Sequence, residues 1–324
     1  MAAPRPDDRP SAPPGPSLAA VVPATDAPPT LDRCTAALRG GERTAEELFV
    51  QRGPAGAGPA AARNAGAARA GGDVLVFVDS DVEVHADALA RVARRFAEDP
   101  SLAAVFGAYD DAPAAPGLTS RFRNLLHHHV HASSAGEAET FWAGLGAVRR
   151  ADFEAVGGFD AERFAAASVE DIELGMRLRE RGARIVLDPA IRGRHLKAWT
   201  PWTMVRTDFR HRGVPWTLLL LERGSGATAL NLGWRHRASA AMCGLLAAAA
   251  LARRPRIALG SLLSVLALNR DLYALLARRG GVPLLAAGIG LHLLHQLTAT
   301  AAAAVAVAAH LRRRARSVPG GGRA

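Results

Sequence analysis

A short apolar run that ends in two acids constrains this chain more than any other feature. The run at 74–78 follows a turn at 71–73 and predicts a buried strand, and Asp79-Ser80-Asp81 comes directly after it. In open α/β sheets, ligands bind at the carboxyl edge of the strands. Side chains two residues apart on an extended segment share a face, so Asp79 and Asp81 can point into one site. Paired carboxylates suit Mg²⁺ or Mn²⁺, and the simpler alternative is a solvated strand end in which Asp81 caps a turn.

Strand and helix patterns alternate over the first two thirds of the chain. Strands are expected at 18–22, 47–51, 73–78, 102–106, 141–148 and 184–187, and helices at 31–39, 59–70, 86–98 and 168–181. The stretch at 110–136 has no clear period and is expected to be irregular. This alternation predicts an α/β fold with a mostly parallel sheet flanked by helices.

The charge of the chain favours a membrane surface over nucleic acid as a partner. The formal net charge is +10, but Lys197 is the only lysine among 40 basic residues, and no nucleic-acid motif is present. Cys34 and Cys243 lie far apart, which argues against a disulfide framework or a zinc site. The start of the chain has no basic-then-apolar signal, so we expect the α/β part to be cytoplasmic.

The composition divides the chain into four parts. We expect a disordered Pro/Ala-rich segment at 1–16, an α/β domain at 17–222, a membrane-associated helical region at 223–316 and a flexible tail at 317–324. The stretch at 282–310 is long enough to span a bilayer. The two apolar stretches within 238–268 are each too short, so they predict either one interrupted crossing or a buried helix hairpin.

Several segments together resemble family 2 glycosyltransferases of the GT-A fold. Ala-Arg-Asn-Ala-Gly at 62–66 and the strand with its acids at 72–81 are similar to the nucleotide side of that family. Gly-Leu-Gly-Ala-Val-Arg-Arg at 144–150, with Val-Gly-Gly-Phe-Asp at 156–160, is similar to its acceptor side. Val-Glu-Asp-Ile-Glu-Leu at 169–174 resembles its Glu-Asp motif at a helix start. The order and spacing of these segments carry the resemblance.

The resemblance implies metal-assisted sugar transfer, with inversion, from a nucleotide-diphospho-sugar donor. Arg63 and Asn64 would belong to the nucleotide site, and Asp79 would face the ribose or a metal-bound water. Asp81, with His195, would hold Mg²⁺ or Mn²⁺. The enzyme would be of the hexosyltransferase type.

On the acceptor side, the resemblance places the general base at Asp171, with Glu170 beside it. Gly144 and Trp199 would contact the acceptor, a lipid-linked or saccharide molecule such as a cell-envelope polysaccharide. The protein would lie at the cell membrane with its catalytic domain in the cytoplasm.

Purely structural roles stay open for several of these residues. Asp171 also fits a near capping box that begins at Ser168, and His195 also fits an ordinary loop histidine. Trp199 also fits packing at a membrane interface. The histidines at 127–129 fit a solvated or acceptor-facing loop better than a metal site, because no Cys or acid accompanies them.

One departure from the family pattern concerns the nucleotide base. Relatives usually carry acids after the second strand, where this chain has Val-Gln-Arg-Gly at 50–53. The alternatives in function are a non-catalytic membrane scaffold with a decayed transferase fold and a sugar nucleotidyltransferase. The latter requires a Gly-rich loop with a basic residue after the first strand, and residues 21–26 lack it.

Overall fold

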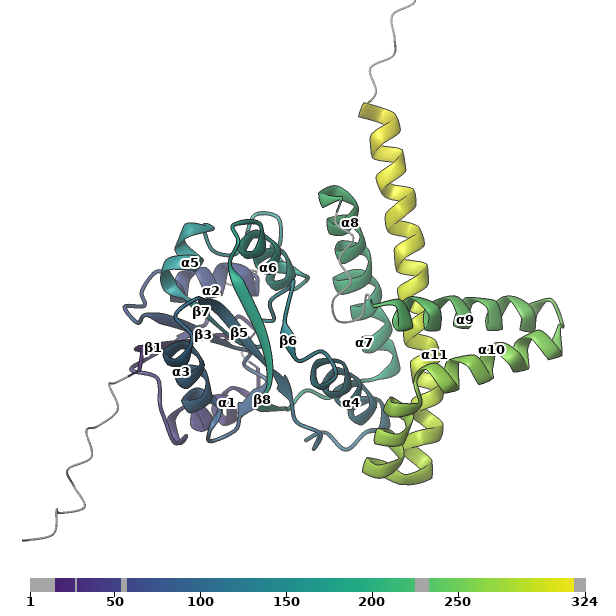
Figure 1. The fold of residues 1–324 in the computed structure, drawn as a ribbon, viewed down its shortest axis with the longest axis horizontal. Helices are drawn as coiled ribbons and strands as arrows, with labels where there is room; N and C mark the ends of the chain where they lie inside the picture. Colours follow the sequence, from purple (N-terminus) through teal and green to yellow (C-terminus); the bar gives the residue numbers. More distant parts are fainter. Residues whose placement is uncertain (1–14, 27, 54–56, 225–232, 318–324) are drawn as a thin grey trace, which may run out of the picture.

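A computed structural model describes residues 15–26, 28–53, 57–224 and 233–317. Within these residues, eight strands form one sheet in the order β2-β1-β3-β7-β5-β8-β4, and β6 pairs with β8 (Figure 1). The strands are β1 (Leu18–Pro23), β2 (Glu47–Gln51), β3 (Val74–Val78), β4 (Val82–Val84), β5 (Leu102–Tyr109), β6 (Gly136–Glu137), β7 (Leu145–Arg149) and β8 (Arg184–His195). Because β3 and β5 both pair antiparallel with β7, the strands β1, β2, β3, β5 and β8 all run in one direction.

Helices cover both faces of this sheet. On one face, α1 (Leu31–Arg39) and α3 (Ala88–Glu98) pack on alternate residues of β1 and β3. On the other face lie α2 (Pro59–Ala67), α5 (Arg150–Ala155) and α6 (Glu170–Glu180) (Figure 1). The strands β1, β3 and β5 are buried along their whole length, which explains why they read as continuous apolar runs.

The structure confirms the predicted α/β fold and corrects two of its segments. The stretch at 110–136, expected to be irregular, contains the helix α4 (Leu118–Ala132). The face that α4 buries carries Arg123, Asn124 and His131 beside its apolar residues, and these polar groups hide the helical period. The last strand, expected at 184–187, continues as β8 as far as His195, so this histidine lies at a strand end and not in a loop.

The chain after the sheet is helical. It forms α7 (Pro201–Arg206), the π-helix η1 (Thr207–Gly213), α8 (Val214–Arg223), α9 (Trp234–Leu251), α10 (Pro255–Leu268) and α11 (Arg270–Ser317). In α11 the helix is interrupted at Gly281, whose φ is +62°. The part of α11 after Gly281 packs against α4, η1 and α8, so the helical region is docked on the sheet domain.

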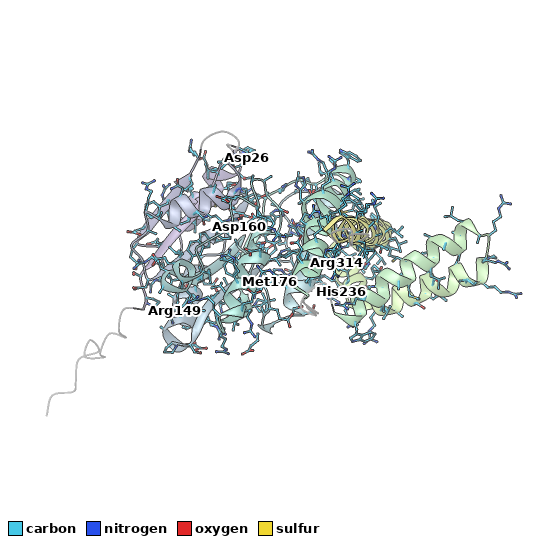
Figure 2. The ribbon with its side chains drawn as sticks, turned by 90° about the horizontal axis from the view of Figure 1, so that it is seen from above. Asp26, Arg149, Asp160, Met176, His236 and Arg314 are labelled. Atoms are coloured by element: carbon cyan, nitrogen blue, oxygen red, sulfur yellow. The ribbon has the colours of Figure 1, made fainter. Side chains whose placement is uncertain are left out.

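The helices α9 and α10 fold back on each other and project away from the sheet domain (Figure 2). The backbone reverses at Arg253, which has a φ of +53°. The residues 238–268 therefore form a hairpin of two antiparallel helices, and this hairpin is not buried. Large apolar side chains are exposed along this hairpin: Leu245, Leu251, Ile257, Leu259 and Leu263.

Within the described residues, one helix is long and apolar enough to cross a membrane. It is the segment Arg270–Arg316 of α11, with a mean hydropathy of 1.4. This finding gives weak support to membrane association, because a core helix of a soluble protein can meet the same criteria. Of the segments expected to be disordered or flexible, 1–14 and 318–324 lie outside the described residues.

Candidate active site

Three parallel strands bring polar side chains to one edge of the sheet. Asp79 and Asp81 follow β3, Asp110 follows β5, and His195 ends β8. The pairing of β4 with β8 places Val82 opposite His195, so Asp81 and His195 become neighbours although they lie far apart in sequence. The predicted grouping at the carboxyl edge of the sheet is therefore present.

Asp81 and His195 lie side by side, and each has an atom that can bind a metal ion. Their Oδ2 and Nε2 atoms lie 3.4 Å apart. The other ring nitrogen of His195, Nδ1, lies 2.6 Å from Oδ1 of Asn124 and must donate to it, since an amide oxygen only accepts. In the neutral ring Nε2 then carries the lone pair, whereas in the protonated ring Nε2 donates to Asp81. Tyr109 stacks on the imidazole with ring centroids 4.4 Å apart and holds its plane.

Charge around Asp81 keeps it ionised. Burial alone would raise its pKa, but the hydrogen bond and charge of a protonated His195, together with the charge of Lys197, bring the pKa below its ordinary value. A carboxylate and a neutral imidazole nitrogen are a suitable donor pair for Mn²⁺ or a similar cation, and an oriented imidazole is typical of metal ligands. Two donors bound to one octahedral cation at about 2.1 Å lie roughly 3 Å apart, close to the separation seen here.

The protein alone supplies too few ligands for a closed metal site. In the part of the chain that the structure describes, no group of three or more His, Cys, Asp or Glu residues is arranged to hold a metal ion. Sites that bind Mg²⁺ through one or two protein ligands are completed by substrate phosphates and water. The geometry fits a cation that binds together with a phosphate-bearing substrate.

Arg63 connects the two predicted acid pairs. Its side chain is buried, and it donates to Oδ1 of Asp79 at 2.6 Å and to Oε1 of Glu170 at 2.9 Å. Burial raises the pKa of Asp79, and the charge of Arg63 opposes that rise. Arg63 thus holds the end of β3 against the start of α6.

Asn64 uses both ends of its amide on the backbone. Its Nδ2 donates to the carbonyl oxygen of Phe159, and its Oδ1 accepts from the amide of the same residue. This clamp fixes the segment after α5, and it gives Asn64 a structural role. Its contact with a nucleotide stays a prediction.

Glu170 and Asp171 have different surroundings at the start of α6. Glu170 accepts from Arg63 and from the amide of Ser168, so both of its carboxylate oxygens are engaged. Asp171 accepts backbone amides only, from Ala143 and Ile172. Burial and the neighbouring charge of Glu170 raise the pKa of Asp171 to about 6. An acid with its pKa near neutrality is suited to proton transfer.

The capping box expected at Ser168 is absent. The residue before α6 is Val169, and no side chain caps the helix there. The hydroxyl of Ser168 donates instead to the carbonyl oxygen of His211 in η1. Asp171 therefore has no capping partner at Ser168.

A cavity of about 300 Å³ opens beside Asp171. Its walls come from α4, from residues 140–142, from the start of α6, and from η1, α8 and α11. Three polar atoms of residues on these walls are buried without a hydrogen-bond partner among the described residues: Nδ1 of His127, Oγ1 of Thr140 and Nε1 of Trp216. Buried polar groups are normally satisfied, so we expect ordered water or a polar ligand to pair with these atoms.

The two predicted acceptor residues, Gly144 and Trp199, have different surroundings. Gly144 accepts from the amide of Asp79, and a Cβ at this position would lie 2.4 Å from the ring of Trp142. A side chain at this position would therefore displace the ring of Trp142. Trp199 is buried between α4 and the C-terminal helices and is not part of the cavity wall, which agrees with packing and gives no support to acceptor contact.

The histidines at 127–129 lie on the helix α4, and the predicted loop is wrong. Nδ1 of His128 lies 2.8 Å from the carbonyl oxygen of Tyr109, and Nδ1 of His131 lies 3.0 Å from that of Gly107. These contacts tie α4 to the end of β5. Sequence reasoning also missed Asn124, Tyr109 and Thr140, because their roles depend on tertiary contacts. The only local signal was the concentration of polar residues between 123 and 131.

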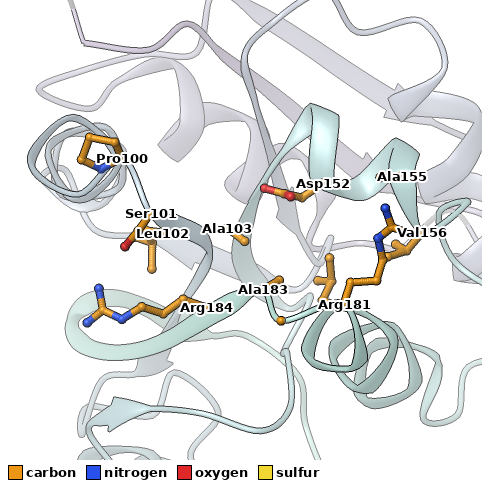
Figure 3. A pocket seen from close by; sticks show the side chains of 12 residues that line it. Pro100, Ser101, Leu102, Ala103, Asp152, Ala155, Val156, Arg181, Ala183 and Arg184 are labelled. Atoms are coloured by element: carbon orange, nitrogen blue, oxygen red, sulfur yellow. The ribbon is translucent and has the colours of Figure 1, made fainter.

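Another hollow, of about 360 Å³, lies at the opposite edge of the sheet. The starts of β5 and β8 and the ends of α5 and α6 surround it, with Arg181 and Asp152 among its side chains (Figure 3). It contains none of the predicted site residues. The chemistry therefore concentrates at the carboxyl edge.

Comparison with known proteins agrees with this geometry. Residues 42–157 match the family model "Glycosyl transferase family 2". Among solved structures, the chain is similar to the mannosyltransferase PcManGT from Pyrobaculum calidifontis, solved in complex with GDP-Man and Mn²⁺. The TM-score is 0.52 and the identity 16%, over 90% of this chain and 87% of that one. At this identity the likeness shows the fold, which is of the GT-A type.

A weaker likeness joins the chain to GalNAc-T7, solved with UDP, GalNAc and Mn²⁺. The TM-score is 0.44 and the identity 15%, over 57% of this chain and 44% of that one. A comparison with curated proteins finds no match to the chain.

Proposed function

Since residues 42–157 match the model of glycosyl transferase family 2, we propose that this chain transfers a sugar from a nucleotide-diphospho-sugar to an acceptor hydroxyl, with inversion at the sugar. One observation carries the proposal. Asp171, whose pKa is raised to about 6, lines a cavity beside the sheet edge that bears Asp79 and Asp81. A donor at the edge and an acceptor in the cavity would meet at this acid.

The donor side rests on Asp81 and His195. These residues would hold Mg²⁺ or Mn²⁺, and the cation, when bound, offsets the charge that develops on the leaving diphosphate. Asn124 keeps His195 in the tautomer whose Nε2 is free. Asp79, whose other oxygen is not engaged by Arg63, is placed to face the ribose or a metal-bound water.

The acceptor side rests on Asp171. The acceptor oxygen attacks the anomeric carbon opposite the diphosphate, the bond from that carbon to the diphosphate breaks, and the acceptor proton passes to Asp171. An acid with a pKa of about 6 is mostly ionised at pH 7 and still basic enough to take the proton. Glu170 serves as a positioning residue, because it is already paired with Arg63.

The C-terminal helices support a location at a membrane. We place the protein at the cell membrane with the catalytic domain in the cytoplasm. The supporting observations are the apolar length of Arg270–Arg316 and the exposed apolar side chains of the α9–α10 hairpin. Fractionation tests this placement: the full chain should stay with membranes through a high-salt wash and leave them only with detergent. Release by salt alone would contradict it.

The decisive experiment is a donor screen on the purified full chain. Nucleotide sugars of the GDP, UDP and dTDP series are incubated with the protein and Mn²⁺ or Mg²⁺, and release of the nucleoside diphosphate is measured. We expect turnover of at least one donor, abolished by excess chelator and restored by added metal. A folded protein that turns over no donor would support the non-catalytic scaffold instead.

A further inference from the structure

The cavity beside Asp171 has walls of two kinds. Near Asp171 the wall carries polar side chains, among them Thr140 and His127. The helices after the sheet contribute both kinds of residue: polar ones, among them Asp208, His295 and Gln296, and the apolar Leu220, Ala299 and Ala303. Leu126 and Val130 of α4 add to the apolar part of the wall.

The polar end offers hydrogen bonds that nothing in the described chain uses. Thr140 is 2% exposed, and its hydroxyl has no partner. Nδ1 of His127 and the indole N–H of Trp216 are likewise buried and unpaired within the described residues. A hydroxyl, an imidazole nitrogen and an indole N–H on residues that line the same cavity as Asp171 match a ligand head that carries several hydroxyl groups.

The far wall is held in place by a buried ion cluster. Arg123 of α4 donates to both carboxylate oxygens of Asp208 in η1, at 2.5 and 3.1 Å, and His295 of α11 lies 2.7 Å from Asp208. Three elements are thus tied together at the cavity. Removal of one partner from such a cluster is costly, so the wall that α11 provides is a fixed part of the site.

We propose that this cavity binds an amphipathic acceptor: a hydroxyl-bearing head at Asp171 and Thr140, with a hydrocarbon tail between α8 and α11. The inference rests on the proposed function and narrows its acceptor from "lipid-linked or saccharide" to a molecule with a lipid tail. A volume of about 300 Å³ is small for an extended polysaccharide strand and suits one head group with the first part of a chain. A small-residue wall at Ala299 and Ala303 leaves room for that chain.

In the proposed step, every bond formed is matched by a bond broken. The head-group oxygen forms the bond to the anomeric carbon, the bond from that carbon to the nucleoside diphosphate breaks with its electron pair going to the diphosphate, and the head-group proton goes to Asp171. No oxidant, reductant or further reactant is needed.

The test compares acceptors that differ only in their tail. The full chain, in lipid nanodiscs, receives its donor and either methyl or octyl glycosides of glucose, galactose and mannose. We expect KM for an octyl glycoside to be at least tenfold below KM for its methyl counterpart, because each buried methylene favours the bound state. Equal KM values in a protein that turns over its donor would overturn the inference while leaving the proposed function intact.

A matched pair of variants separates binding of the tail in the cavity from partition of the octyl glycoside into the lipid of the nanodiscs. Ala299→Phe fills the apolar wall, whereas Ala301→Phe places the same ring on the exposed side of the same helix. Partition of the octyl glycoside into the lipid is the same for both variants. We expect Ala299→Phe to lose the preference for octyl over methyl, and Ala301→Phe to keep it. The same preference in both variants, at unchanged melting temperatures, would contradict the inference, and loss of donor turnover in the wild type would contradict the proposed function itself.

Discussion

Two acid pairs at the site differ in sequence position and share one arrangement. Asp79 and Asp81 end the strand β3, and Glu170 and Asp171 begin the helix α6. In each pair Arg63 holds one acid: Asp79 at 2.6 Å and Glu170 at 2.9 Å. The other acid of each pair, Asp81 or Asp171, forms no ion pair with an arginine of the described residues.

The comparison teaches how a buried site can keep reactive acids. A buried carboxylate without a partner is costly, and a carboxylate paired with arginine is a poor ligand or base. Here one arginine offsets two acids and fixes the strand end against the helix start. The two remaining acids are shifted in opposite directions: the pKa of Asp81 is lowered and that of Asp171 is raised to about 6. One is suited to hold a cation and the other to take a proton.

The largest effect is expected from Asp171→Asn. Asparagine keeps the size and still accepts the amide of Ala143, but it cannot take the acceptor proton, so transfer should fall by roughly 10² to 10⁴. Donor affinity should survive. The matched control is Glu170→Gln, for which we expect a smaller loss of transfer because Glu170 is already paired. Near-normal transfer by a folded Asp171→Asn protein would return Asp171 to a structural role, and a larger loss in Glu170→Gln would move the base by one residue.

The next effect is expected from Asp81→Ala. Loss of a metal ligand removes charge stabilisation from the leaving diphosphate, so donor turnover should fall by about 10² or more. The activity of the wild type in excess chelator should fall to a similar level. Turnover that is unaffected by chelator would rule out the metal role, and a normal apparent affinity for Mn²⁺ in Asp81→Ala would place the ligand elsewhere.

Arg63→Met tests the link between the pairs through stability. The substitution leaves the buried carboxylate of Glu170 and the part-exposed carboxylate of Asp79 without their partner, so the free energy of unfolding should drop by about 3 to 5 kcal/mol, mostly through Glu170. Chemical denaturation of the full chain in nanodiscs measures the change. The triple variant Arg63→Met, Asp79→Asn, Glu170→Gln should recover much of the loss, and failure to recover would show that packing of the arginine side chain matters more than its charge.

The smallest effect is the pH dependence of transfer. Asp171 must be ionised to accept a proton, so transfer should fall about tenfold for each pH unit below about 6. Glu170, Arg63 and Arg212 act on the charge of this acid and contribute to the midpoint. Because the folded pKa lies above the ordinary value of 3.8, this group also makes the fold less stable as pH rises from about 4 to about 6. A flat profile in the wild type across this range would exclude Asp171 as the base.

The strand end at Asp79 and Asp81 could be predicted because it depends on local pattern. An apolar run bounded by a turn and followed by acids is visible in one stretch of sequence, and strand–helix alternation gives its place in a sheet. The pairing of Asp81 with His195 was expected only from the family resemblance. Its geometry needed β8 to run eight residues beyond its predicted end.

The cavity and its walls could not be predicted from the sequence, and the reason is physical. The helix α4 buries Arg123, Asn124 and His131, so its apolar period is broken where it carries the site. Asn124 orients His195 across 71 positions, and Asp208 joins residues of α4 and α11. Such contacts are set by tertiary packing, and no local propensity encodes them. The lining of the cavity becomes apparent only when α11 lies against the sheet domain.

Because the cavity wall includes α11, the two halves of the site are completed at different times during synthesis. Translation proceeds from the N-terminus, and domains generally fold as units in that order. The strand end with Asp81 and the helix start with Asp171 are synthesised well before Ala299 and Ala303, which follow Asp171 by more than a hundred residues. A nascent chain can therefore carry the strand end with Asp81 while part of the cavity wall has yet to be made, and it gains the complete cavity only when α11 docks.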